Sequence, residues 1–356
     1  MSATGPGRLL VYGAYGYTGE LVARRAVARG LPVVLAGRAE APLAALAAAL
    51  GVPHRAVPLD GPAALRAGLD GVAAVLHCAG PFSRTAAPMA AACLAAGVHY
   101  LDVTGEVPVF EALWRLDGAA RAAGVTLLPG AGFDVVPSDC LAAHLAARLP
   151  GAQRLTLAFQ AAGRPSRGTT LTALEGLHLG GLVRRGGRLT RVPAAWRTRS
   201  FDLGEGPVRC MTVPWGDVFT AFISTGIPDV EVYMAAPAAL RLAARAAQAL
   251  APLFGSGPVQ RLLARRVRAT AAGPTAAERA RGASLLWGEV EHADGRRASA
   301  RLRVAEGYAF TALSAVACAE RVLAGGVSPG FQTPSSAFGA GFVLSIEGSA
   351  RSDLAS

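Results

Sequence analysis

The chain has 356 residues, of which 52% are apolar and 17% are charged, and this balance excludes a disordered chain and allows two well-packed domains. Its formal net charge is +11, and all 35 basic residues are arginine because no lysine occurs. The absence of lysine excludes Schiff-base catalysis and a lysine general acid. The arginines are spread through alanine-rich stretches without interleaved aromatic residues, so we expect no nucleic-acid partner.

The five cysteines are far apart and form no C-x-x-C pair, so we expect reduced thiols and no metal site. The N-terminus lacks the basic flank and apolar core of a signal peptide, and no uninterrupted apolar run reaches the roughly 18 residues of a membrane span. We therefore expect a cytoplasmic protein.

The first strand of the chain is expected at Leu9–Tyr12, a short apolar run that suits a buried parallel strand. Gly13, Gly16 and Gly19 follow at a spacing of three, before a helix from about Thr18. Glycines allow a tight turn and close approach of a pyrophosphate, which the helix N-terminus attracts. This pattern predicts a dinucleotide site, and a purely structural turn is the alternative.

The second strand, Pro32–Ala36, ends at Gly37 and Arg38. An NAD site places an acidic residue at about this position for the ribose 2′-hydroxyl, whereas an arginine suits the 2′-phosphate. Arg38 therefore indicates NADP(H). The alternative is an arginine that is simply solvated at the end of a strand.

Strands and helices alternate over residues 1–150, which predicts an α/β fold with a Rossmann-type doubly wound parallel sheet. The further strands are expected at Arg55–Pro58, Val72–Cys78, His99–Asp102 and Thr126–Leu128. The further helices are expected at Pro42–Leu50, Pro62–Leu69, Ala86–Ala96, Phe110–Ala123 and Pro137–Leu149.

A second, α+β domain for substrate binding or dimerisation is expected over residues 151–325, where the pattern becomes richer in strands. Its expected elements are strands at Arg154–Gln160 and Val230–Met234, a hairpin of Leu285–His292 and Arg297–Val304 turning at Asp294-Gly295, a connection over Arg164–Arg199 and a helix at Gly307–Leu323. Residues 326–356 form a tail that we expect to return to the first domain.

The stretch Pro237–Arg268 alternates aliphatic clusters with arginines in helical register. Two interpretations stay open for it. One is a pair of amphipathic helices that cover a sheet, and the other is a lid or a contact with a membrane surface or lipid.

Ligands of doubly wound sheets bind beyond the carboxyl ends of the strands, so the turns that follow the strands are the candidate sites. The small residues Cys78, Ala79, Gly80 and Pro81 would let a nicotinamide approach the backbone, unless this is an ordinary turn with Phe82 in the core. Polar groups also follow the strands in 100–106 and 129–139.

Several ordered motifs resemble the saccharopine dehydrogenase-like oxidoreductases, a family that includes trans-acting enoyl reductases. The matching motifs are GAYGYTG at 13–19, AGR at 36–38, CAGPF at 78–82, YLDVTGE at 100–106, GFDVVPSD at 132–139, GDVFTAFISTGIPDVEVYM at 216–234 and TPSSAFG at 333–339. The resemblance covers nearly the whole chain.

The resemblance implies a Rossmann domain followed by an α+β domain, with NADPH in the groove between them. The cofactor role then falls on Gly13, Tyr15, Gly16, Tyr17, Thr18, Gly19, Arg38, Gly80 and Pro81, which match the family's motif positions. The apolar, lysine-free second domain favours a substrate that is less polar than a dicarboxylated amino-acid adduct.

A hydride transfer also needs a group that supplies a proton. The candidates are Asp134, Ser138, Asp139 and Tyr233, with Tyr100 and Glu106 as weaker ones. The alternative is structural: Ser138 caps the following helix, Asp139 complements its dipole and Asp134 holds the turn. His77 and His99 lie in or beside apolar strands and are expected to be satisfied core residues.

The leading hypothesis is an NADPH-dependent reductase of a C=C or C=N bond in a hydrophobic or amino-acid-derived small molecule, with the enoyl case preferred. A saccharopine-type amino-acid dehydrogenase and a non-catalytic NADP(H)-sensing or scaffold protein stay open as alternatives. A homodimer is the expectation from base rates.

Overall fold

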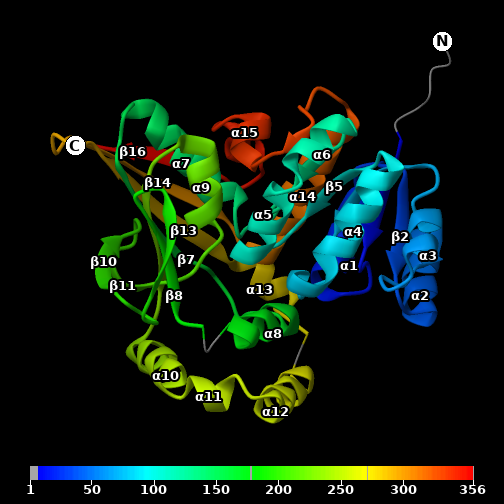
Figure 1. Cartoon of the computed structure of the whole chain (residues 1–356), viewed down its shortest axis with the longest axis horizontal. Helices are drawn as coiled ribbons and strands as arrows, with labels where there is room; N and C mark the ends of the chain where they lie inside the picture. The colour runs from blue at the N-terminus through cyan, green and yellow to red at the C-terminus, as the bar shows by residue number, and fades with distance from the viewer. Residues whose placement is uncertain (1–6, 177–178, 271, 356) are drawn as a thin grey trace. The chain divides into compact units, whose positions relative to one another are not determined.

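The computed structural model describes residues 7–176, 179–270 and 272–355 and divides the chain into two compact units. Unit 1 comprises residues 1–136 and 308–339, and unit 2 comprises residues 137–307 and 340–356. Figure 1 shows their elements along the chain.

Unit 1 contains a parallel sheet of seven strands among the described residues, in the order β15-β6-β5-β4-β1-β2-β3. Its strands are β1 (Arg8–Tyr12), β2 (Val33–Gly37), β3 (His54–Ala56), β4 (Val72–His77), β5 (His99–Asp102), β6 (Thr126–Leu128) and β15 (Gly330–Phe331). Its helices are α1 (Tyr17–Ala28), α2 (Glu40–Leu50), α3 (Pro62–Gly68), α4 (Phe82–Ala96), α5 (Val107–Trp114), α6 (Asp117–Ala122), α14 (Gly307–Leu323) and α15 (Pro334–Phe338).

The predicted doubly wound α/β fold is confirmed. The sheet order turns back at β1, because β2 and β3 lie on one side of it and β4, β5 and β6 on the other. The central strands are buried along most of their length, as the apolar runs indicated. A ligand is expected beyond the carboxyl end of β1, where the strand order reverses.

Unit 2 contains a mixed sheet with the order β10-β11-β12-β7-β13-β14-β16, and among the described residues β8 and β9 join it beside β12. Its strands are β7 (Arg154–Gln160), β8 (Gly181–Arg185), β9 (Arg188–Val192), β10 (Thr198–Asp202), β11 (Pro207–Thr212), β12 (Asp229–Ala235), β13 (Ala283–Glu291), β14 (Arg297–Ala305) and β16 (Ala350–Leu354). Its helices are α7 (Val136–Arg148), α8 (Arg167–Gly176), α9 (Asp217–Thr225), α10 (Ala238–Ala249), α11 (Ala251–Phe254), α12 (Gly257–Arg268), α13 (Ala276–Arg281) and the 3₁₀ helix η1 (Phe342–Ser345).

Two expectations for the elements were wrong. The single helix expected over Phe110–Ala123 is two helices, α5 and α6, separated at Arg115 and Leu116. The stretch expected to be a connection, Arg164–Arg199, holds α8 and the strands β8 and β9, which pair around Gly186 and Gly187. Both glycines have positive φ, +52° and +76°, which a tight hairpin turn requires.

The expected second domain began at residue 151, whereas unit 2 begins at Pro137 because α7 is counted with it. The tail divides between the units. Its β15 pairs with β6 in unit 1, and β16 pairs with β14 in unit 2. No helix in the described part of the chain is long and apolar enough to cross a membrane.

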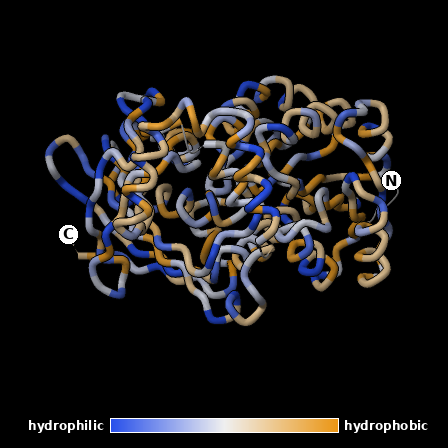
Figure 2. The backbone as a smooth tube through the Cα atoms, turned by 90° about the horizontal axis from the view of Figure 1, so that it is seen from below, coloured by the Kyte–Doolittle hydropathy of each residue, from blue (hydrophilic) through white to orange (hydrophobic). Residues whose placement is uncertain are grey.

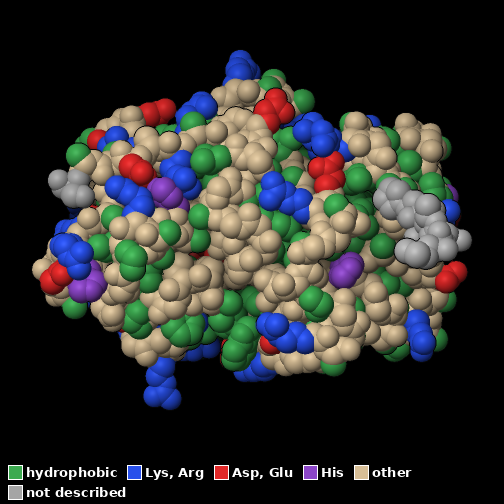
Figure 3. Space-filling view, turned by 90° about the horizontal axis from the view of Figure 1, so that it is seen from above, with side chains coloured by type: hydrophobic (Ala, Val, Ile, Leu, Met, Phe, Trp, Pro, Cys, Tyr) green, Lys and Arg blue, Asp and Glu red, His purple; other side chains and the backbone are tan. Residues whose placement is uncertain are grey.

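Hydrophobic and hydrophilic stretches alternate along the backbone in Figure 2. In Figure 3 the arginine side chains are scattered over the visible face and do not form one continuous patch. This distribution agrees with the dispersed positive charge of the sequence.

Candidate functional site

The turn after β1 brings backbone unusually close to backbone. Gly13 has φ +79°, and a Cβ on it would lie 2.9 Å from the backbone nitrogen of Ala79. A Cβ on Gly19 would lie 2.1 Å from the carbonyl oxygen of Gly13. No side chain caps the N-terminus of α1 at Gly16. The turn therefore presents the backbone N–H groups and the positive end of a twelve-residue helix to an anion.

Arg38 lies at the same edge of the sheet as this turn. The backbone nitrogens of Gly13 and Ala14 donate to the carbonyl of Ala36 at 2.8 and 3.2 Å, and Arg38 comes two residues after Ala36. The Arg38 side chain is exposed, and no ion pair within the described residues involves it. A guanidinium so placed can bind a phosphate next to the glycine turn.

Tyr15 covers the end of β2. A Cβ on Gly37 would lie 2.6 Å from Cε1 of the Tyr15 ring, so only glycine allows the ring to rest on this backbone. The neighbouring Tyr12 donates its hydroxyl to the carbonyl of Val57 at 2.8 Å. Burial raises the pKa of Tyr12 to about 12, while the positive charge of Arg38 acts in the opposite direction. These contacts fix the backbone beside Arg38.

The turn after β4 reaches the same edge. The Cys78 nitrogen donates to the Tyr12 carbonyl at 2.8 Å, the Gly80-Pro81 peptide is cis, and Gly80 is exposed. Burial and the charge of Asp102 raise the pKa of the Cys78 thiol to about 12. Cys78 therefore stays protonated near neutral pH and packs in the turn, where a nucleophile would need a lowered pKa.

The N-terminus of α4, unlike that of α1, is already occupied. The Glu106 carboxylate accepts hydrogen bonds from the backbone nitrogens of Phe82 and Ser83, both at 2.8 Å. Sequence reasoning named Glu106 as a weaker proton donor, and its position is that of a helix cap. Because Glu106 already bonds to the N-terminus of α4, the N-terminus of α1 is better suited to an anionic ligand.

Asp102 joins the turns after β5 and β6. It is fully buried and accepts hydrogen bonds from the Tyr100 hydroxyl at 2.7 Å and from the backbone nitrogens of Thr104 and Gly130 at 3.0 and 2.9 Å. Burial raises its pKa to about 6, although these three donors act to lower it. No role for Asp102 was foreseen from the sequence. The only signal was a polar residue at the end of an apolar strand.

Asp134 follows β6 in the chain, and its carboxyl group is partly exposed and has a raised pKa. A Cβ on Gly105 would lie 2.7 Å from Oδ2 of Asp134, so the carboxylate rests against that backbone. Burial, followed by the charge of Glu106, raises the pKa of Asp134 to about 7. Its side chain is partly exposed, and no hydrogen bond from a described residue to it is found. A carboxyl group of this kind holds a proton near neutral pH and can release it.

The support for Asp134 comes from α14. The Phe133 nitrogen donates to Oγ1 of Thr311 at 3.0 Å, and the Ser314 hydroxyl donates to the carbonyl of Ala131 at 2.8 Å. A Cβ on Gly132 would lie 2.9 Å from Cγ2 of Thr311. The turn that presents Asp134 is therefore fixed by a helix more than 170 residues away in sequence.

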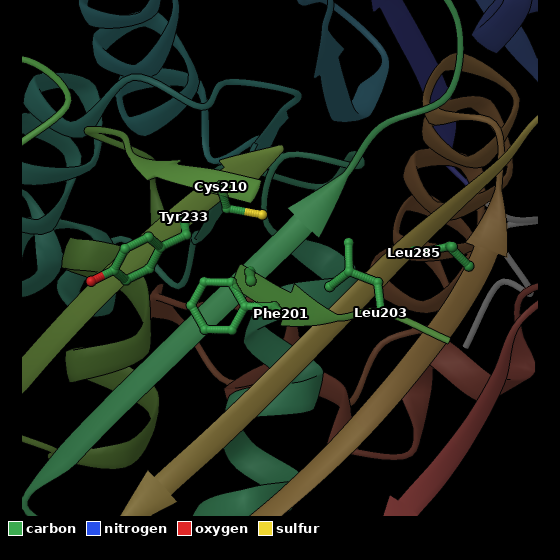
Figure 4. Packing of buried hydrophobic residues seen from close by; sticks show 6 residues of the cluster. Phe201, Leu203, Cys210, Tyr233 and Leu285 are labelled. Atoms are coloured by element: carbon green, nitrogen blue, oxygen red, sulfur yellow. The ribbon is translucent and has the colours of Figure 1, made fainter. Parts of the chain in front are cut away.

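The three other proposed proton donors belong to unit 2 and have buried surroundings. Asp139 is fully buried and accepts a hydrogen bond from the Ser224 hydroxyl at 2.6 Å. Ser138 lies inside the first turn of α7 and not at its N-cap. Tyr233 belongs to a core cluster with Phe201 and Cys210, shown in Figure 4, and donates to Glu231. These contacts favour packing and positioning roles.

The two histidines differ from each other. His99 accepts a hydrogen bond from the Thr126 nitrogen at 3.0 Å, as a satisfied core residue should. His77 is fully buried among the rings of Tyr12, Phe82 and Tyr100, and neither ring nitrogen has a hydrogen-bond partner among the described residues. Burial lowers its pKa to about 3, so the ring is neutral.

A hollow of about 1160 Å³ in unit 1 lies between α3 and α4 and is bordered by Val72 and Val98. These valines stand at the amino ends of β4 and β5, away from the edge that carries the glycine turn. Within the described residues, no group of three or more His, Cys, Asp or Glu side chains could hold a metal ion.

Comparison with known proteins agrees with this geometry. A family model described as the saccharopine dehydrogenase NADP binding domain matches residues 9–128. A Mycobacterium tuberculosis protein named as a trans-acting enoyl reductase is 36% identical over 159 residues, which are 42% of this chain and 38% of that protein. A saccharopine dehydrogenase-like oxidoreductase of Bos taurus is 30% identical over 155 residues, 38% of this chain and 36% of that protein. The matched part thus spans little more than a third of these curated relatives.

The fold extends this similarity. The apo saccharopine dehydrogenase (L-Glu forming) from Saccharomyces cerevisiae superimposes with a TM-score of 0.66 over 98% of this chain and 100% of that one, at 13% identity. Unit 1 has the doubly wound fold of dinucleotide-binding domains, with the glycine turn and Arg38 at the edge where such folds bind their ligands. More specifically, residues 9–128 match the model of the saccharopine dehydrogenase NADP binding domain, so the predicted resemblance is confirmed for this part of the chain, and the match agrees with NADP(H) as the cofactor.

Proposed function

We propose that this protein is an NADPH-dependent oxidoreductase that reduces a C=C or C=N bond of a hydrophobic or amino-acid-derived small molecule, with an enoyl substrate preferred. The observation that carries the proposal is the exposed Arg38, without an ion pair among the described residues, beside the uncapped start of α1. The names of the trans-acting enoyl reductases among the relatives support the preference for an enoyl substrate.

Each residue of this edge has a distinct task in the proposal. The backbone of 13–19 binds the pyrophosphate, and Arg38 binds the 2′-phosphate. Tyr15 and the turn 78–81 border the cofactor. The bound cofactor supplies the hydride.

Asp134 is the proposed proton donor. Reduction of a polarised double bond needs a proton on the atom next to the one that receives hydride, and a carboxyl group with a pKa of about 7 is suited to give it. Ser138 and Asp139 follow in the same motif, and we assign them to positioning because Asp139 accepts a hydrogen bond from Ser224.

A saccharopine-type dehydrogenase is the alternative that the similar fold of the yeast enzyme favours. Such an enzyme must bind several carboxylates, whereas unit 2 buries an apolar cluster and its arginines Arg185 and Arg197 are already paired with Glu231. A protein that binds NADP(H) without turnover is the third reading.

The first test is a parallel titration with NADPH and NADH, followed by tryptophan fluorescence and by the shift in melting temperature. We expect Arg38→Ala to weaken NADPH binding by about ten- to a hundredfold, since a charged hydrogen bond contributes about 1.5–3 kcal/mol. NADH binding should change little. Arg66→Ala, an exposed arginine on α3, is the matched control and should change neither affinity. Equal losses of NADPH and NADH affinity in Arg38→Ala would contradict the assignment.

The second test offers acceptors to the NADPH-loaded protein and follows the loss of NADPH absorbance. Oxidation of NADPH in the presence of enoyl thioesters supports the enoyl reductase. Oxidation of NADPH only in the presence of imines of dicarboxylic amino acids supports the saccharopine-type dehydrogenase. Tight NADPH binding without oxidation by either class supports the sensor.

A further inference from the structure

Helices α10, α11 and α12 form a continuous stretch, residues 237–270, here called the basic amphipathic segment. Figure 1 shows the three helices following one another along the rim of unit 2. Leu240, Leu242, Leu250, Leu253 and Leu262 all lie in it, and each is more than two-fifths exposed. Soluble surfaces rarely gather so many large apolar side chains in one place without a function.

Exposed apolar residues form one face of α10. Ala239, Leu242, Ala246 and Ala249 are spaced by three or four residues, so they line one side of this helix, and Leu253 follows in α11. All five are exposed, and the side chain of Leu242 has a relative accessibility of 71%. In α10 only Ala247 is buried, and in α11 no described residue is.

Three polar side chains of α10 bond to backbone groups of unit 2. Arg241 donates to the carbonyl of Ala236 at 2.7 Å, and Arg245 donates to the carbonyl of Ala195 at 3.0 Å. Gln248 accepts a hydrogen bond from the backbone nitrogen of Ala194 at 2.5 Å. A helix that only covered a core would turn its apolar side inward. Helix α10 buries only Ala247 and leaves most of its other apolar residues exposed, unlike the covering helix considered from the sequence.

Helix α12 adds positive charge. It packs against α8, and Gln260 donates to the carbonyl of Leu174 at 3.2 Å. Its arginines Arg261, Arg265, Arg266 and Arg268 are exposed, beside Leu262. The sequence contains no Asp or Glu between Val232 and Ala277, so this charge is not balanced within the segment.

We propose that the basic amphipathic segment docks on an anionic lipid bilayer surface. The apolar face of α10 and α11 would enter the boundary between headgroups and acyl chains, and the arginines of α12 would meet lipid phosphates. A second copy of the chain is a poorer occupant, because a two-fold interface would bring arginine-rich faces together. The docking is interfacial, and these helices are too short to span a bilayer.

The experiment is flotation of the full-length protein with vesicles of phosphatidylcholine containing one quarter phosphatidylglycerol, and with vesicles of phosphatidylcholine alone. We expect binding to the anionic vesicles that weakens with added salt and is much lower on the neutral ones. The double variant Leu242→Ser/Leu253→Ser should reduce partitioning more than tenfold. Arg265→Ala/Arg266→Ala should reduce it by about twenty-five-fold, since each arginine contributes roughly fivefold.

Two variants serve as matched controls. Leu344→Ser removes an exposed leucine of unit 2 outside the segment, and Arg188→Ala/Arg209→Ala removes two exposed arginines of the same unit. Neither should alter vesicle binding. The melting temperature and NADPH affinity of every variant should equal those of the parent, which separates this test from the cofactor assignment.

Several outcomes would overturn the proposal. The first is that the parent protein does not bind anionic vesicles. The second is that the Leu242→Ser/Leu253→Ser variant binds them as well as the parent does. The third is that the control variants lose as much vesicle binding as the variants of the segment. A parent protein that forms dimers, with dissociation in the leucine variant and no vesicle binding, would assign the face to a second copy.

Discussion

Gly19 determines how closely α1 packs on the glycine turn after β1. A Cβ at this position would meet the backbone carbonyl of Gly13 at 2.1 Å, and a backbone carbonyl cannot move away as a flexible side chain can. We expect Gly19→Ala to lower the free energy of unfolding by about 1–3 kcal/mol or more and to weaken NADPH binding, because the turn must open. Urea denaturation and NADPH titration measure the two effects.

Gly118 offers the matched control. It is an exposed glycine inside α6, and a Cβ there would meet nothing within 4 Å. Gly118→Ala should leave NADPH affinity unchanged and raise stability by about 0.5–1 kcal/mol, since alanine is the better helix former. If both alanine variants behaved alike, the close approach at Gly19 would not matter.

Asp134 is expected to couple proton transfer and stability to pH. Its folded pKa is raised from 3.8 to about 7, so the folded state binds this proton more tightly than the unfolded chain. The stabilising contribution is therefore present below about pH 4 and is lost as the pH rises toward 7. A shift of this size corresponds to at most about 4 kcal/mol, and the partial exposure of the side chain reduces it.

The variant Asp134→Asn removes this titration. At pH 8 it should be more stable than the parent, and the fall in stability between pH 4 and 7 should be smaller. If Asp134 donates the proton, turnover should also drop at least a hundredfold with NADPH affinity unchanged. Melting temperatures over this pH range and steady-state rates separate the two effects. A lower melting temperature at pH 8 together with retained turnover would assign Asp134 to holding the turn.

At the scale of the secondary-structure elements, Asp102 joins the turns after β5 and β6 through its hydrogen bonds. Its two oxygens serve three donors, and Asp102→Ala would leave the Tyr100 hydroxyl and the nitrogens of Thr104 and Gly130 without this acceptor. We expect a loss of about 2–4 kcal/mol in the free energy of unfolding. Chemical denaturation measures it.

Asp70→Ala is the control for this prediction. Asp70 is exposed in the loop after α3, and its removal should change stability by no more than about 0.5 kcal/mol. Equal denaturation midpoints for the parent and Asp102→Ala would show that the buried carboxylate makes no net contribution to the free energy of unfolding.

Elements with strong local patterns were predicted well. The strand Arg154–Gln160 and the helix Gly307–Leu323 have the expected bounds, and Asp294-Gly295 forms the expected hairpin turn, with Gly295 at φ +88°. Weak local signals failed. The glycines and arginines of 164–199 indicated a connection without regular structure, because the strands there are stabilised by pairing: β8 and β9 pair with each other, and β8 also pairs with β12.

At the scale of the whole molecule, unit 1 is built from two distant parts of the chain. Helix α14 buries Phe310, Ala315, Cys318 and Val322, and β15 pairs with β6 and forms the edge of the sheet. A fragment of residues 1–150 would lack both and expose the apolar surface that they cover. We expect this fragment to aggregate or unfold without a cooperative transition and to bind NADPH at least tenfold more weakly than the full chain.

A second fragment supplies the contrast. Residues 1–136 joined to 308–339 through a flexible glycine-serine linker should unfold cooperatively and bind NADPH, because this chain holds both parts of unit 1. Thermal unfolding and NADPH titration of the two fragments give the answer. A stable 1–150 fragment that bound NADPH as tightly as the full chain would contradict the assignment of residues 308–339 to unit 1.

The sequence by itself determined the parts whose cause is local. The apolar runs, the glycine spacing and the arginine after the second strand predicted the parallel sheet, the glycine turn and NADP(H), because strand burial, backbone freedom and charge belong to single residues or short windows. Only the tertiary structure decided which polar side chains are engaged in hydrogen bonds and which have shifted pKa values. Glu106 caps α4, Asp102 joins two turns and Asp134 has a raised pKa, since burial and hydrogen bonding arise between residues that lie far apart in the chain.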